Sequence, residues 1–165
     1  MGERSPTMAV EVGSQAPDFT LLNTERQPVS LSSLTGDKAA VIAFFPAAFS
    51  GVCQKELCTF RDGLSDYNDL NANVVAISPD HVFSNKAFAE QNEINFPVLT
   101  DFTLSTIKAY DVAFENFAGV EGYTACARAV FVVDKEGKVA YAEVTENPGV
   151  EPNYEAVQAA VKALG

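Results

Sequence analysis

Three cysteines, Cys53, Cys58 and Cys126, are the side chains of this sequence best suited to covalent chemistry. No CxxC spacing joins them, and the start of the chain has no apolar stretch resembling a signal peptide. We therefore expect a cytoplasmic protein without a framework of structural disulfides. A thiol kept in that compartment is buried and inert, bound to a metal, or reactive. Because His81 is the single histidine, no metal site and no other cofactor are expected.

Cys53 occupies a position that favours a reactive sulfur. The apolar run at residues 39–45 predicts a strand that Pro46 ends, and a helix then begins near Ser50. With Ser50 as the N-cap, Cys53 falls in the first helical turn, where free backbone N–H groups and the helix dipole favour thiolate over thiol. The loop also follows a predicted parallel strand, at the edge where open α/β sheets bind ligands. A buried, inert cysteine remains the alternative.

Short apolar runs bounded by turn residues predict the strands that carry this loop. They cover residues 39–45, 73–78 and 128–133, and a tight turn leads from the last run into a hairpin arm at 138–144. Residues 19–22 and 27–31 predict another hairpin near the start of the chain.

Apolar residues at spacings of three and four predict the helices. One stripe runs through residues 53–70, and further helices are expected at 82–91, at 104–110 and after Asn153, which can cap the last one. Because strands alternate with helices, we expect an α/β fold with a central mixed sheet flanked by helices, largely parallel and with antiparallel strands added by the hairpins. Residues 8–165 form one domain in this interpretation, and residues 1–7 are an added or disordered start.

Composition restricts the classes of partner. The chain has 165 residues, 47% of them apolar, which suffices for one domain with a substantial core. Its 22 acidic residues outnumber 11 Lys and Arg, and the net charge of -11 repels nucleic-acid phosphates and anionic lipid. No apolar run approaches the ~18 residues that cross a bilayer. Neither a nucleic acid nor a membrane is expected as a partner.

The residues around Cys53 resemble the signature of the peroxiredoxin family. Pro46-x-x-x-Ser50-x-x-Cys53 is similar to the family's proline, its serine or threonine, and its peroxidatic cysteine. The Ala-Pro-Asp-Phe segment at 16–19 resembles the family's N-terminal strand, and residues 128–134, beginning with Arg128, resemble its late strand. The resemblance covers residues 12–164. It is nearest to the alkyl hydroperoxide reductase E type, with some likeness to the bacterioferritin comigratory protein type.

This resemblance implies a thioredoxin-like fold with an extra N-terminal hairpin. It also implies a thiol-dependent peroxidase that reduces hydrogen peroxide and organic hydroperoxides in antioxidant defence. Cys53 is then the nucleophile that becomes a sulfenic acid. The Ser50 hydroxyl and the backbone N–H groups of Val52 and Cys53 would donate to the peroxide oxygens. Arg128 would hold the thiolate and one of these oxygens, and Pro46 would shield the sulfur from water.

Three further residues have roles that remain open. Glu56 matches a glutamate common in the nearest subfamilies, and either braces Arg128 or is an ordinary acid of the first turn. Cys58 has the spacing from Cys53 seen in enzymes with an intramolecular disulfide, and either resolves the sulfenic acid or is a packed helix residue. A Cys53–Cys58 bond requires the helix to unwind, because five residues rise about 7.5 Å along it. Cys126 is expected to be packed and inert.

The resemblance also implies partners. We expect a hydroperoxide substrate, thioredoxin or another small thiol reductase, and a homodimer that uses apolar surface at Phe49 and residues 114–117. Two other classes use the same features: a redox sensor or holdase built on Cys53, and a dithiol–disulfide oxidoreductase. The latter would need CxxC where this chain has Cys-Gln-Lys-Glu. His81 is expected at the surface or at a helix cap.

Overall fold

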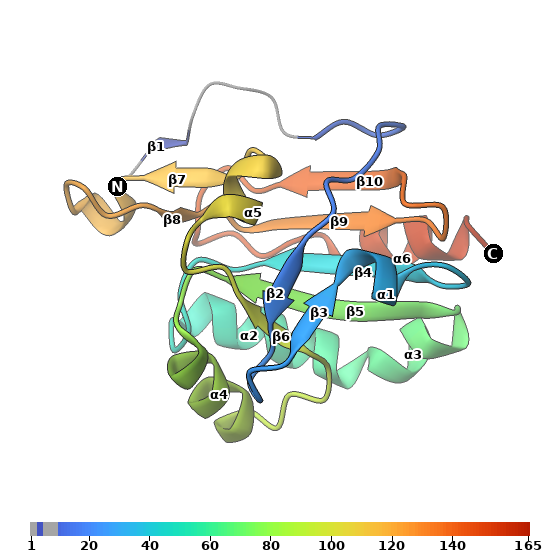
Figure 1. Ribbon diagram of the computed structural model, residues 1–165, viewed down its shortest axis with the longest axis horizontal. Helices are drawn as coiled ribbons and strands as arrows, with labels where there is room; N and C mark the ends of the chain where they lie inside the picture. Colours follow the sequence, from blue (N-terminus) through green and yellow to red (C-terminus); the bar gives the residue numbers. More distant parts are fainter. Residues whose placement is uncertain (1–2, 5–9) are drawn as a thin grey trace.

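The computed structural model describes residues 3–4 and 10–165. Within these residues a seven-stranded sheet forms the centre, helices pack on both of its faces, and a three-stranded sheet lies beside it (Figure 1). The strands are β1 (Glu3–Arg4), β2 (Thr20–Leu22), β3 (Pro28–Ser30), β4 (Ala39–Phe44), β5 (Ala72–Ser78), β6 (Val98–Thr100), β7 (Ala113–Glu115), β8 (Ala125–Cys126), β9 (Ala129–Val133) and β10 (Val139–Val144). The helices are α1 (Leu31–Leu34), α2 (Gly51–Asp62), α3 (Leu64–Asp69), α4 (Val82–Gln91), α5 (Ser105–Ala109), the 3-10 turn η1 (Phe117–Gly119) and α6 (Tyr154–Lys162).

The central sheet is mixed, and less of it is parallel than the alternation of strands and helices predicts. Its strands run in the order β10-β9-β4-β5-β6-β2-β3, and the parallel pairs are β4–β5 and β5–β6. Parallel neighbours need a crossover connection, which α2 with α3 and then α4 supply. The strand β9 instead reaches β4 from the small sheet and pairs antiparallel with it, and the two predicted hairpins add the outer strands. The carboxyl end of β4 therefore faces the start of β9.

Two apolar layers hold the helices to the sheet. All six residues of β4 are buried, and because alternate side chains point to opposite faces, this apolar run fills both layers. Ile42 belongs to the layer under α1 and α5, and Val41 to the layer under α2, α3, α4 and α6. Full burial of such a side chain contributes roughly 1.5–3 kcal/mol, so this packing fixes the position of the strand.

The predicted helix at residues 53–70 is two helices. The chain leaves helical geometry at Gly63, which ends α2 and precedes α3. Glycine is a poor helix former, and here its N–H still bonds back to the carbonyl of Thr59. Leu57, Phe60 and Tyr67 are all buried against the same face of the sheet. The apolar stripe therefore continues across the break, which is why the spacing alone did not reveal it.

The small sheet was not anticipated from the sequence, and it corrects one expectation about the surface. It has the order β1-β7-β8, with Glu3 and Arg4 paired to β7. Residues 1–2 and 5–7 of the expected added start lie outside the described residues. Phe114, expected on an exposed loop, lies in β7 and is buried, whereas Phe117 packs edge-on against it and is half-buried. These two rings close the core instead of offering an apolar surface.

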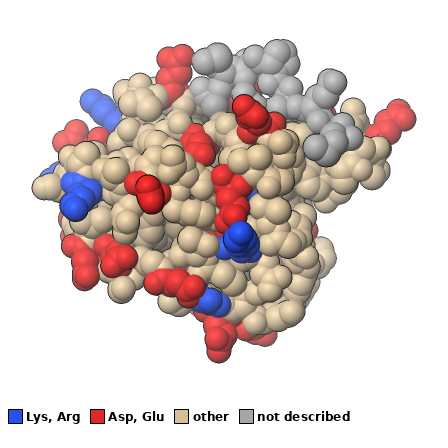
Figure 2. Space-filling model, turned by 180° about the vertical axis from the view of Figure 1, so that it is seen from behind, with Lys and Arg blue, Asp and Glu red and all other residues tan. Residues whose placement is uncertain are grey.

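Acidic side chains outnumber basic ones. Figure 2 shows Asp and Glu side chains spread over one face of the molecule with fewer Lys and Arg among them, in keeping with the net charge of -11. In the described part of the chain, no helix is long and apolar enough to cross a membrane. The same residues contain no group of three or more His, Cys, Asp or Glu side chains that could hold a metal ion.

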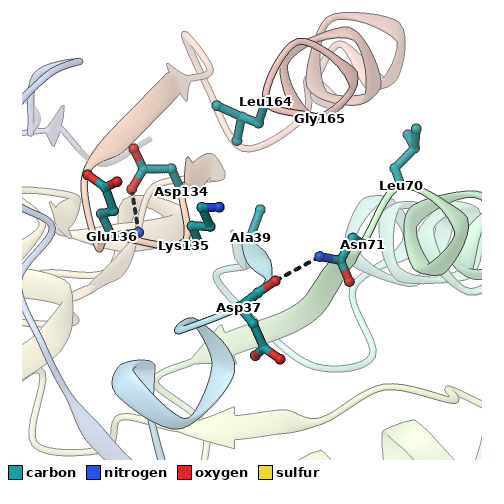
Figure 3. A pocket seen from close by; sticks show the side chains of 9 residues that line it. All are labelled: Asp37, Ala39, Leu70, Asn71, Asp134, Lys135, Glu136, Leu164 and Gly165. Carbon is teal, nitrogen blue, oxygen red and sulfur yellow. Dashed lines mark hydrogen bonds between the residues drawn. The ribbon is translucent and has the colours of Figure 1, made fainter.

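A pocket of about 320 Å³ lies at the amino end of β4, the end opposite to Cys53. Asp37, Asn71, Asp134 and Lys135 are among its lining residues, and Asn71 donates to the carbonyl of Asp37 (Figure 3). None of its lining residues is a cysteine, so this pocket is separate from the chemistry that the cysteines suggest.

Candidate active site

Cys53 lies in the first turn of α2, after the loop that follows β4. Ser50 is the N-cap of this helix, as predicted, and its Oγ accepts a hydrogen bond of 3.4 Å from the Cys53 N–H. Pro46 is buried just beyond β4, and Val52 is half-buried in the same turn as Cys53. The Cys53 N–H, expected to donate to a peroxide, is thus engaged by the cap, which leaves the Ser50 hydroxyl proton as a donor.

Arg128 brings a guanidinium group to the sulfur of Cys53. Its Nη2 lies 3.1 Å from Cys53 Sγ, and its Nη1 lies 2.7 Å from Oε1 of Glu56. Nε and Nη2 both donate to the carbonyl of Pro148, at 3.1 and 2.9 Å. The planar group therefore has acceptors on three sides, and Arg128 is only 1% exposed.

Glu56 forms a fully buried ion pair with Arg128. Burial raises the pKa of Glu56 to about 7, although the Arg128 charge and hydrogen bond act in the opposite direction. Its Oε2 has no hydrogen-bond partner within the described ranges. Burial lowers the pKa of Arg128, but the Glu56 and Cys53 charges raise it overall, so Arg128 stays a cation. Of the two interpretations of Glu56, the contact with Arg128 favours the brace.

The other two cysteines lie in different surroundings, and all three are free thiols. Cys58 is half-buried on α2, and its Sγ donates to Oδ1 of Asn92 at 3.8 Å. Cys126 lies in β8 and is fully buried, and burial followed by the Cys53 charge raises its pKa well above the usual value. A thiol in that position is little ionised, which fits the expected packed and inert role.

Two site contacts have no counterpart in the sequence-based prediction. The Pro148 acceptor is a backbone carbonyl in the loop before α6, and residue types give no signal for such a group. Asn92, the C-cap of α4, carries no sequence signal for its contact with Cys58 either. His81 is the N-cap of α4, where its side chain accepts from the Ser84 N–H, as expected of a helix cap.

Solved structures with the same architecture are peroxiredoxins. Peroxidoxin BcpB from Mycobacterium tuberculosis superposes with a TM-score of 0.83 at 28% identity, covering 96% of this chain and 99% of that chain. A peroxiredoxin-like protein from Aquifex aeolicus gives a TM-score of 0.84 at 30% identity, covering 96% and 90% of the two chains. The mixed sheet with its flanking helices is therefore the thioredoxin-like fold of a peroxiredoxin.

Sequence comparison agrees with the structural match. The chain is 37% identical over 142 residues to alkyl hydroperoxide reductase E of Mycobacterium bovis, which covers 85% of this chain and 88% of that protein. The model of the AhpC/TSA family matches residues 12–142. The chain belongs to the AhpC/TSA family, and it is a peroxiredoxin, a thiol-dependent peroxidase of antioxidant defence.

Proposed function

We propose that Cys53 is the peroxidatic cysteine and that Arg128, Ser50 and Pro46 assist it. The observation that carries this proposal is the 3.1 Å contact between Arg128 Nη2 and Cys53 Sγ at the start of α2. The guanidinium charge and the positive end of the helix dipole both stabilise a thiolate there. The buried Pro46 and the burial of Cys53 itself keep water from the sulfur.

The proposed step is a displacement on a hydroperoxide, either hydrogen peroxide or an organic one. The Cys53 thiolate attacks the distal oxygen of ROOH, the S–O bond forms as the O–O bond breaks, and alkoxide or hydroxide leaves and takes up a proton. The products are Cys53 sulfenic acid and an alcohol or water. Negative charge moves from sulfur to oxygen in this step. The Arg128 guanidinium, the Ser50 hydroxyl and the Val52 N–H are proposed to donate hydrogen bonds that stabilise it.

Glu56 is proposed to position Arg128 without fully neutralising the guanidinium charge. The 2.7 Å bond to Nη1 orients the guanidinium toward Cys53. Because the pKa of Glu56 is raised to about 7, a fraction of this carboxyl is protonated near neutral pH. A partly neutral Glu56 competes less with the thiolate for the same cation.

Recycling of the sulfenic acid is proposed to use Cys58 and a small thiol reductase such as thioredoxin. Cys58 attack on Cys53 sulfenic acid forms the disulfide and releases water, and two electrons from the reductase dithiol then restore both thiols. Both cysteines lie on the continuous helix α2, so its first turns must unwind for this bond to form. Cys58 is half-buried, which supports access by such a partner after unwinding.

The protein is proposed to act in the cytoplasm, since its three free cysteines suit a reducing compartment, and to form a homodimer. The side chains of Phe49, Val120 and Tyr123 are 51%, 53% and 41% exposed. The N–H of Ala48, next to Phe49, donates to Asp80, and burial together with the Asp80 charge raises the pKa of Tyr123, so these residues lie in one region of the surface. Such apolar surface supports a contact there. Light scattering should give twice the monomer mass, and a monomer at high concentration would exclude the dimer.

A turnover assay tests the function as a whole. The protein with thioredoxin, thioredoxin reductase and NADPH should consume hydrogen peroxide and cumene hydroperoxide through many cycles. The matched Cys53→Ser variant should consume neither. A single stoichiometric oxidation that then stops, with thioredoxin and with low-molecular-weight thiols alike, would instead indicate a redox sensor.

A further inference from the structure

The loop between Pro46 and Ser50 is hydrogen-bonded to Asp80, a residue outside the loop. The N–H of Ala48, in the middle of this loop, donates to Oδ2 of Asp80 over 2.6 Å. Asp80 follows β5, the strand beside β4, and is 32 positions away in the sequence. A hydrogen bond to a carboxylate at this distance is among the stronger kinds.

Asp80 is itself anchored in the core. Its N–H donates to Oγ of Ser78, and the Ser78 hydroxyl lies 3.4 Å from Oδ2 of Asp80. The Asp80 carbonyl accepts from the hydroxyl of Thr100 on β6. Ser78 and Thr100 are both buried, so these hydrogen bonds fix Asp80 to the ends of the parallel strands β5 and β6. The Asp80 carboxylate is therefore a fixed point at the carboxyl edge of the sheet.

The loop conformation needs such a support. Phe49, next to Ala48, has φ = 67°, in the left-handed region that costs a residue other than glycine roughly 1–2 kcal/mol. Its ring packs edge-on against Phe88 at 5.4 Å, while its side chain stays half exposed. Ser50 follows this turn directly and caps the Cys53 N–H. The Ala48–Asp80 bond and the Phe88 contact hold the turn against its strain.

We propose that Asp80 is a positioning residue of the peroxidase reaction, and this inference rests on the function proposed for Cys53. Asp80 holds the Ala48 N–H and thereby places the Ser50 hydroxyl for the peroxide oxygens. It does not touch the sulfur. Arg128, directly before β9, is held beside Cys53 by Glu56 and the Pro148 carbonyl, and neither of these belongs to the loop. Loss of Asp80 should therefore slow the reaction with peroxide more than it lowers the general reactivity of the Cys53 thiolate.

Two reactions of the same sulfur separate these effects. The first is oxidation by hydrogen peroxide in stopped flow, and the second is alkylation by iodoacetamide, followed by mass spectrometry of the Cys53 peptide. In Asp80→Ala the peroxide rate constant should fall by about tenfold or more, because aligned donors matter only to the peroxide. The alkylation rate should stay near that of the wild type. Asp80→Asn keeps an oxygen that can accept the Ala48 N–H and should recover most of the peroxide rate. Asp69→Ala, an exposed acid of α3, is the matched control and should change neither rate.

Each alternative outcome has a definite meaning. An unchanged peroxide rate in Asp80→Ala, or an equal loss in both reactions, overturns the positioning role. Failure of Asp80→Asn to recover the rate shows that charge and not the hydrogen bond matters, and overturns it too. If Asp80→Ala does not fold, Asp80→Glu keeps the charge but displaces the oxygen, and it should show the same selective loss. A wild-type protein whose Cys53 reacts with iodoacetamide but not with peroxide refutes the proposed function itself, and with it this inference.

Discussion

Arg128 Nη2 lies 3.1 Å from the sulfur of Cys53, although the two residues are 75 positions apart in the chain. Strand pairing explains the contact. Because β9 runs antiparallel to β4 with Ala129 opposite Phe44, Arg128 stands at the end of β4, where the loop to α2 begins. The positive end of a helix and a buried cation therefore meet at one sulfur.

Cys53→Ser should abolish peroxide consumption, because the hydroxyl of serine is not ionised at neutral pH and is a poor nucleophile toward peroxide. Cys58→Ser and Cys126→Ser should keep the first oxidation step, since neither thiol contacts Arg128. Stopped-flow measurement of hydrogen peroxide loss with the three variants checks this. Rapid peroxide reduction by Cys53→Ser would contradict the assignment of the nucleophile.

Arg128→Lys should slow oxidation of Cys53 by about tenfold or more, although the charge is kept. The guanidinium donates at once to Cys53, Glu56 and the Pro148 carbonyl, and a lysine ammonium cannot reach three acceptors in that plane. The second-order rate constant of oxidation is the measurement, with thermal unfolding as the control for stability. An unchanged rate constant would remove Arg128 from the reaction.

Glu56 should make the stability of the protein depend on pH. Its pKa is raised by burial from 4.5 to about 7, so between these values the folded state binds a proton that the unfolded state has lost. The free energy of unfolding should then decrease as pH rises from 4.5 to 7, by on the order of 3 kcal/mol. Glu56→Gln should flatten this dependence in urea unfolding measured across the window. Parallel curves for the two proteins would show that Glu56 does not titrate there.

Asn92 should restrain the unwinding of α2. Gln54 donates to its side-chain oxygen at 2.8 Å, Cys58 contacts the same oxygen, and Arg61 donates to its carbonyl at 2.6 Å. Asn92→Ala removes the first two contacts. Each ~1 kcal/mol by which this lowers the free energy of unwinding α2 should speed formation of the Cys53–Cys58 disulfide by about fivefold. The sulfenic acid should form at an unchanged rate.

Quenched alkylation with mass spectrometry follows both steps of this reaction. Gln54→Ala removes one of the same contacts and should give a smaller acceleration than Asn92→Ala. Disulfide formation should also lower the helical signal in circular dichroism. If peroxide leaves Cys53 as sulfenic acid with Cys58 still a free thiol, the enzyme works with one cysteine and this prediction is wrong.

The local parts of the site follow from the sequence alone. Pro46, Ser50 and Cys53 lie within eight residues, so a strand end, a helix cap and a first helical turn result from residue types and short spacings. The cap at Asn153 is predicted for the same reason and is present, and His81, predicted at the surface or at a helix cap, caps α4. The peroxiredoxin resemblance, which rests on the order and spacing of such residues, is confirmed by the match to the AhpC/TSA family.

Tertiary structure decided the contacts that join distant segments. Residue periodicity records which face of an element is buried but not which strand pairs with it, so the antiparallel approach of β9 to β4 could not be read from the chain. The break at Gly63 was hidden because both helices bury the same face. The Pro148 carbonyl and the Ala48 N–H are backbone groups that every residue carries, and only the fold selects these two to hold Arg128 and the loop before Cys53.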